Sequence, residues 1–280
     1  MFKTKDGKLN IYLLIGVIMA AVILMLSLLS LVWTPYSPTA MSAALKFKAP
    51  SFAHIFGTDN FGRDIFSRVM KAIGTSFLVS VFVVLISGTA GVLIGSVTGY
   101  FGGIVDAAVM RIVDAINGFP SILLALVIIS VLGKGRGNVI LALGIAFTPS
   151  FVRIVRGEFI RLRDADYIIR ARLMGAKKTR ILFVHILPNI FSIFWVSVMI
   201  GFNNAILAES GLSYLGIGVQ PPDATLGSML SDAQGYLQSA PWYAMAPGLT
   251  IVWMVLAAAM LSEGMARSEK TPLVGKSSGR

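Results

Sequence analysis

The sequence has no cysteine and little charge. Only 13% of its 280 residues are charged, whereas 56% are hydrophobic; soluble domains carry about 25% charged residues. Without cysteine the chain can form neither disulfide bonds nor thiolate metal sites. The scarcity of charge excludes an ordinary soluble domain. It predicts a polytopic membrane protein, with a length that suits about six spans and short loops.

Recognisable catalytic and nucleotide-binding motifs are also absent. No stretch fits the phosphate loop G-x-x-x-x-G-K-[ST], the zinc motif H-E-x-x-H or a nucleophile elbow. The two histidines, His54 and His185, are isolated in the sequence, and a structural role is favoured for each. We therefore expect no catalytic site, no metal site and no cofactor in this chain.

The net charge of +11 does not predict nucleic-acid binding, because most basic residues lie near the ends of apolar segments, as membrane topology requires. The basic residues of segment 1–10 precede the first apolar segment, 11–33, and predict a cytoplasmic N-terminus. That segment exceeds the roughly 7–15 apolar residues of a signal peptide, which favours an uncleaved span. The basic tail, 266–280, is predicted to be cytoplasmic too.

The apolar segments predict an all-α polytopic membrane protein with six transmembrane helices. Loop 34–75 and loop 210–241 are expected to be external, the second one helical near 226–237, and residues 76–265 to form a five-helix core. Pro120 is expected to kink or interrupt its span. The predicted spans are 11–33, 76–99, 105–132, 139–154, 187–207 and 242–261.

One of these spans carries a glycine stripe. Gly91, Gly95 and Gly99 recur every four residues, which in lipid lets a second helix approach closely. Glycine is also common in membrane helices in general. In the next span Asp114, if it lies deep, is expected to pair with Arg111.

Polar residues at membrane depth mark the fifth span. Asn203 and Asn204 lie within it, and Glu209 follows closely. Such groups are costly in lipid and should face other helices or a wet cavity. Hydrogen bonding between helices is the favoured interpretation, and lining of a translocation path remains the alternative.

The segment GTDNFGRD, at 57–64, lies at the end of the first predicted external loop. Its residue types favour a turn. Local pairing is expected among Asp59, Arg63 and Asp64.

The largest basic excess lies between Arg153 and Arg180, so the loop in this region, 158–186, is predicted to be cytoplasmic. Within it, DYIIRARLMGAKKTRILFVHILP predicts a short helix, a turn at Gly175 and a second helix. Asp164 and Asp166 suit a helix N-terminus. Pro188 suits the first turn of the following membrane helix.

This segment, 166–188, resembles the EAA loop of ABC-importer permeases, whose pattern is Glu-Ala-Ala, three residues, Gly, nine residues and Ile-x-Leu-Pro. The spacing is kept, although Ile169 stands at the place of the Glu and Arg170 stands at the second place of the pattern. Motifs GTDNFGRD, GYFGG, HILPN, ESGLSYLGIGVQPP and SAPW extend the resemblance to the dipeptide, oligopeptide and nickel branch. The resemblance implies ATPase-coupling residues at Ile169, Arg170, Ala171, Arg172, Gly175, Ala176, His185, Leu187 and Pro188.

The same resemblance implies a type I ABC importer permease core in a bacterial cytoplasmic membrane. The implied partners are a second homologous permease, two cytoplasmic ATPase subunits that hold ATP and Mg²⁺, an external substrate-binding protein and membrane lipids. Peptides are the expected cargo, and nickel or a metal chelate is the alternative. An ion-driven secondary transporter is a more distant alternative, since the sequence shows no internal repeat.

Overall fold

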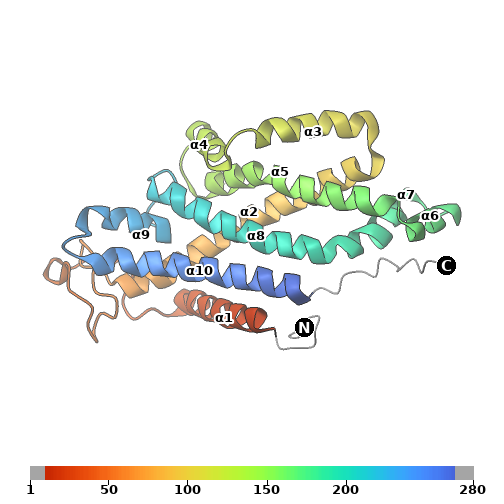
Figure 1. Ribbon diagram of the computed structural model, residues 1–280. Coiled ribbons are helices and arrows are strands. Elements are labelled where there is room, and N and C mark those ends of the chain that lie inside the picture. The colour runs from red at the N-terminus through yellow and green to blue at the C-terminus, as the bar shows by residue number, and fades with distance from the viewer. Residues whose placement is uncertain (1–9, 269–280) are drawn as a thin grey trace.

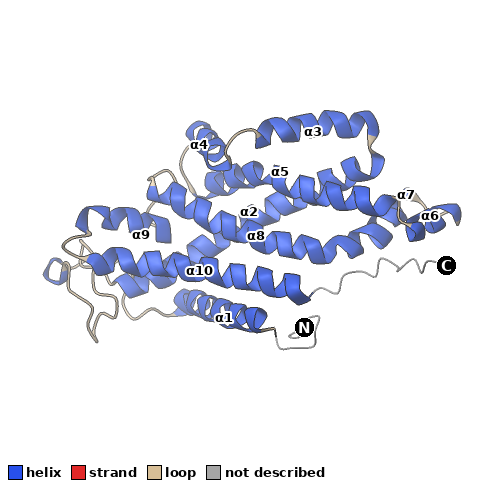
Figure 2. Ribbon diagram, viewed as in Figure 1, coloured by secondary structure: helices blue, strands red, loops and turns tan. Residues whose placement is uncertain are grey.

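The computed structural model describes residues 10–268 and builds them almost entirely from helices (Figures 1 and 2). No strand forms in this range beyond a single bridge between Thr58 and Asp64. The predicted all-α fold is therefore confirmed. Such a fold satisfies backbone hydrogen bonds within each segment, as a membrane interior demands.

Five helical runs in the described range are long and apolar enough to cross a membrane. A sixth candidate span is the pair α3 (Gly103–Asn117) and α4 (Ser121–Leu132), bent by 88° around Pro120. Pro120 thus interrupts this segment more strongly than a kink would. The five runs are α1 (Ile11–Val32), α2 (Ile65–Phe101), α5 (Arg136–Arg163), Lys178–Tyr214, which contains α8 (Leu187–Tyr214), and α10 (Pro241–Ser268).

Helix α2 begins at Ile65, well before the predicted start near residue 76, so the expected external loop ends earlier than residue 75. Asp64 caps this early turn, since its carboxylate accepts hydrogen bonds from the Ser67 amide (2.8 Å) and hydroxyl (2.7 Å). Asp64 also pairs with His54 Nδ1 at 2.9 Å rather than with its predicted local partners. The hydropathy pattern misses this turn because it contains Arg68, which is nevertheless buried.

Arg68 is buried because Asp59 lies beside it. The Asp59 carboxylate, itself buried, accepts hydrogen bonds from Arg68 and from Arg63 Nε (2.6 Å), the second being the predicted local pair. Arg68 Nη2 also lies 3.5 Å from Asp232, far along the chain. The turn is therefore part of a tertiary polar cluster that ties the start of α2 to the second loop.

Short elements gather at the two ends of the bundle. One end carries η1 (Ala43–Leu45), α9 (Leu226–Ala233) and η3 (Gln234–Tyr236), and α9 lies where a helical stretch was predicted. The other end carries α6 (Asp166–Leu173), α7 (Lys178–Arg180) and the π-turn η2 (Ile181–Ile186) (Figure 1). Helix α8 continues to Tyr214, beyond the predicted limit of its span and into the expected loop 210–241.

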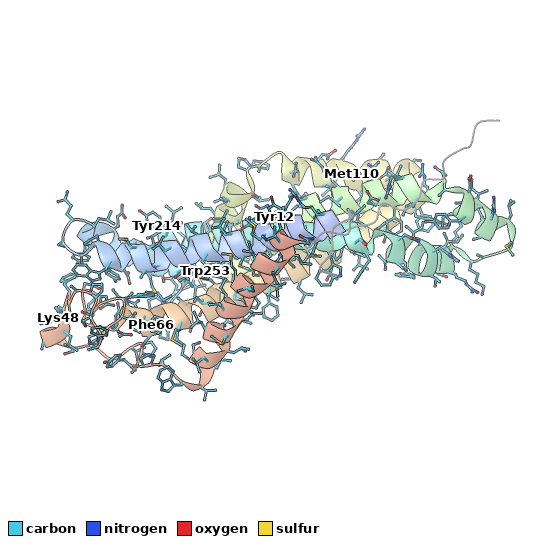
Figure 3. The ribbon with its side chains drawn as sticks, turned by 60° about the horizontal axis from the view of Figure 1, so that its bottom comes forward. Tyr12, Lys48, Phe66, Met110, Tyr214 and Trp253 are labelled. Atoms are coloured by element: carbon cyan, nitrogen blue, oxygen red, sulfur yellow. The ribbon has the colours of Figure 1, made fainter. Side chains whose placement is uncertain are left out.

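Helices α2, α5 and α8 form the centre of the bundle, and α1 packs against α10 at one side. Asn10 caps α1 and donates a hydrogen bond to the Gly264 carbonyl of α10 (2.6 Å). Figure 3 shows Tyr12 and Trp253 along this contact, where the Trp253 indole donates to the Met19 carbonyl (3.4 Å). Both ends of the described chain lie on the same side of the bundle as α6 (Figure 1).

Candidate functional site

Helix α6 follows α5 after a turn of two residues, Asp164 and Ala165. Asp166 occupies its first turn, where a negative charge favours the helix dipole. The residue at the N-cap position is Ala165, and no side chain caps the helix there. The acidic residue expected at the start of the helix therefore acts through its charge and not through a capping hydrogen bond.

The end of α6 depends on Gly175. Its φ of 83° is in the left-handed region, which favours glycine. The Gly175 amide donates to the Arg172 carbonyl (3.1 Å), and the Ala176 amide donates to the Ala171 carbonyl (3.0 Å). These two bonds define a Schellman motif, which satisfies carbonyls that the helix end would leave unpaired. The predicted turn at Gly175 is thus present.

Ile168 anchors α6 to the membrane helices. It is fully buried in an apolar cluster with Val155 and Phe159 of α5 and with Ile181 and Ile186 of η2. Burial of an isoleucine side chain contributes about 1.5–3 kcal/mol. This cluster therefore joins α6 to the ends of α5 and α8.

An exposed apolar tip lies beyond this anchor. Leu173 is 82% exposed and Met174 87% exposed, at the end of α6 that points away from the bundle. These two residues were not among the predicted coupling residues. An apolar pair just before Gly175 in a basic segment could have indicated an exposed contact surface. The basic side chains around the tip, all exposed, are Arg170, Arg172, Lys177, Lys178 and Arg180.

The remaining residues of the predicted motif take varied positions. Ile169 is exposed, whereas Ala171, Ala176, His185 and Leu187 are partly buried. The motif residues therefore do not form a single surface. Some of them face outward, and the others pack against the ends of the membrane helices.

Pro188 lies in the first turn of α8, as predicted. Helical structure runs without a break from Lys178 to Tyr214, and the turn before the proline widens into the π-turn η2. Proline has no N–H to donate to the preceding turn, and its ring crowds that turn. The Asn189 side chain donates to the His185 carbonyl (2.6 Å) within this widened region. The predicted helix start at Pro188 is thus present, but a widened turn joins it to the helix before it, so that the two form one continuous run.

The glycine stripe of α2 faces α5. A Cβ added at Gly91 would lie 2.3 Å from Phe151 Cβ, and one at Gly95 would lie 2.8 Å from the Val152 carbonyl oxygen. A Cβ at Gly99 would lie 2.7 Å from the Arg156 carbonyl oxygen of α5. No methyl group fits at these distances, so the glycines set how closely α2 and α5 approach.

The polar residues of α8 do not form one site. Glu209 is fully buried, and its carboxylate accepts hydrogen bonds from Ser76 of α2 (2.9 Å) and Ser213 of α8 (2.7 Å). This is a hydrogen bond between helices. Asn204 is exposed, whereas the side-chain oxygen of Asn203 is buried without a hydrogen-bond partner among the described residues.

Asn204 instead lines a cavity of about 510 Å³ at the bend between α3 and α4. Its other polar lining residues are Asn117, Ser121 and Ser150, and Phe119 closes part of the wall. Asp114 of α3 pairs with Arg153 of α5 (2.6 Å) and not with the predicted Arg111. A turn of α3 separates Asp114 from this cavity.

The fold is a bundle of membrane helices with a projecting basic helix, and no phosphate-loop motif occurs in the sequence. These features define a class: the multi-pass helical membrane protein. Residues 91–267 match the family described as the binding-protein-dependent transport system inner membrane component. The chain belongs to this family and is a multi-pass membrane transport subunit.

Curated relatives include a dipeptide transport system permease protein, DppC, of Alkalihalophilus pseudofirmus, 37% identical over 93% of this chain and 86% of the relative. The DppC of Haemophilus influenzae is 34% identical over 90% and 88%. A glutathione transport system permease, GsiD, of Pectobacterium atrosepticum is 39% identical over 78% and 72%. Among solved structures, a chain of the inward-facing MetNI methionine ABC transporter has a TM-score of 0.56 at 17% identity, covering 74% of this chain and 97% of that one. This last similarity supports the type I importer fold alone.

Proposed function

We propose that this chain is one of two permease subunits of an ATP-driven importer of peptides. The names of the relatives, which refer to dipeptides and glutathione, favour peptide cargo over nickel or a metal chelate. A second homologous permease supplies the other half of the pathway, and an external binding protein delivers the peptide. ATP and Mg²⁺ are bound by two partner ATPase subunits, since this sequence has no phosphate loop.

The observation that carries this proposal is the exposed tip of α6. Leu173 and Met174 are large apolar side chains left in solvent at the end of a basic helix. A solvent-exposed apolar pair with a charged rim fits insertion into a groove on a partner, where the rim charges guide docking. When ATP closes the ATPase pair, α6 moves, and the cluster around Ile168 carries that movement to α5 and α8. The bundle is then a two-state element biased by nucleotide.

The arrangement of the ends supports a topology. Both ends of the described chain lie on the same side of the bundle as α6, and α9 lies at the other side (Figure 1). With α6 in the cytoplasm, both termini are cytoplasmic, and the end with α9 faces the binding protein. The membrane is then the bacterial inner membrane.

Reconstituted vesicles test the function. Uptake of a labelled dipeptide should require loaded binding protein and ATP at the ATPases, and it should survive collapse of ion gradients. Uptake that stops when the gradients collapse and ignores ATP would support a secondary transporter instead. Uptake of Ni²⁺ without peptide uptake would show that the cargo is nickel and not a peptide.

Variants of the tip test the coupling role. Leu173→Ser with Met174→Ser should weaken ATPase docking by more than about 100-fold, because each lost apolar contact costs about 1.5–3 kcal/mol. Leu237→Ser, an equally polar change at an exposed leucine near α9, serves as the control. Copurification of the ATPases with the permease should be lost in the first variant and kept in the second. Full copurification in both would show that α6 is not the docking element.

A further inference from the structure

Helix α3 has almost no core of its own. Val113 is its only buried residue. At its start, Gly102 and Gly103 have φ of 63° and 65°, in the left-handed region, and at its end the chain bends around Pro120. Within this chain, apolar burial therefore does little to hold α3 against its neighbours, and the backbone breaks at both ends make it a separate rod.

Two arginines of α5 hold this rod. Arg156 binds Asp106 through both Nε (2.6 Å) and Nη2 (2.7 Å), and Arg153 Nη2 binds Asp114 (2.6 Å). Asp106 and Asp114 are about 12 Å apart along the helix axis at 1.5 Å per residue. Two separated contacts fix both the position and the tilt of α3 relative to α5. The bidentate ion pair between Arg156 and Asp106 also fixes the rotation of α3 about its axis.

The clamped rod connects two regions described above. On one side, α5 continues through a two-residue turn into α6. On the other side, α3 ends at Asn117 in the wall of the polar cavity, which Asn204 of α8 also lines. Figure 1 shows α3 lying along α5 between these two regions.

We propose that Arg156–Asp106 and Arg153–Asp114 make α3 move with α5 as one rigid unit, so that a displacement of α6 reshapes the polar cavity at the bend between α3 and α4. The positioning residues, which hold α3 against α5, are Arg153, Arg156, Asp106 and Asp114. The inference rests on the proposed function, since it describes how the displacement of α6 by the ATPases reaches the polar cavity.

The first test measures peptide transported per ATP hydrolysed by the whole complex in vesicles. Asp106→Asn and Arg156→Gln should keep the hydrolysis that loaded binding protein stimulates, while transport per ATP falls by about 5-fold or more, the usual range of a coupling energy. The exchanged pair, Asp106→Arg with Arg156→Asp, should recover most of this loss. Arg111→Gln removes an exposed charge from the same helix that makes no ion pair among the described residues, and it should keep the wild-type ratio.

Two outcomes would overturn the proposal. A wild-type ratio in both single variants would show that the pairs transmit nothing, and an exchanged pair no better than the single variants would show that pairing is not the cause. Loss of stimulated hydrolysis in the wild type would instead refute the proposed function, so the two failures are distinguishable.

A second measurement leaves all four charged residues of the two ion pairs in place. Spin labels on Ala108→Cys in α3 and Gly157→Cys in α5, both exposed positions of a cysteine-free chain, report the distance between the two helices. In otherwise wild-type complex this distance should be the same without nucleotide and with trapped ATP. A distance that changes between these two states would overturn the rigid unit.

Discussion

The contact between α2 and α5 allows a prediction whose magnitude follows from the structure. In Gly91→Ala the new Cβ would lie 2.3 Å from Phe151 Cβ and 3.0 Å from the Phe151 carbonyl carbon. Carbon atoms pack best at about 3.5–4.0 Å. Neither atom of Phe151 can move by a change of rotamer, so the two helices must separate. Such overpacking costs about 1–3 kcal/mol.

A matched control isolates this cost. Gly157 of α5 is also within a helix, and a Cβ there meets nothing within 4 Å. Both substitutions replace glycine by alanine in a helix, so the gain in helix propensity, about 0.8–1 kcal/mol, is common to the two. The difference between the variants should therefore equal the overpacking cost of about 1–3 kcal/mol.

The assay is thermal unfolding of the purified permease in detergent, read by the loss of monodisperse protein. Gly91→Ala should unfold at a lower temperature than Gly157→Ala, and Gly95→Leu should in addition reduce assembly. If Gly91→Ala unfolds at the same temperature as Gly157→Ala or above it, the close approach of α2 and α5 at this point is wrong.

Three further predictions concern other parts of the chain. Gly175→Val places a β-branched residue at a φ of 83°; normal amounts in the membrane with loss of transport and of substrate-stimulated hydrolysis are expected, and wild-type values of both would remove the loop from the coupling path. Single cysteines at Thr179 and Gln220 should be labelled from the cytoplasm and from outside respectively, and external labelling at Thr179 would reverse the topology. Glu209→Ala leaves the buried Ser76 hydroxyl without its acceptor and should lower stability by about 1–3 kcal/mol in detergent melting; an unchanged melting temperature would show that this hydrogen bond contributes nothing.

Much of the fold followed from composition and pattern. Long apolar runs can only be helices in a membrane, because every backbone polar group must be satisfied within its own segment. The start of α1 near Ile11, the interruption at Pro120 and the turn at Gly175 are local effects of hydropathy, of a missing N–H and of a positive φ. Local chemistry was therefore enough to predict them.

Charged residues near the spans were harder to assign from the sequence. Arg68 falls in the predicted external loop, yet it is buried because Asp59 and Asp232 are brought to it by the fold. Arg153, likewise, reads as one more basic residue of the cytoplasmic loop, but it holds α3 through Asp114. The partners are far away in the sequence, so no local pattern identifies them.

The sequence by itself determined the class of protein, the helical segments and the existence of a basic loop with a glycine turn, because hydropathy, charge and φ preference act over a few residues. Only the tertiary structure decided that Leu173 and Met174 form the exposed tip, that Gly91 faces Phe151 and that α3 is held by arginines of α5. Which face of a helix is covered depends on the helices that pack beside it, and those are set by contacts between residues far apart in the chain.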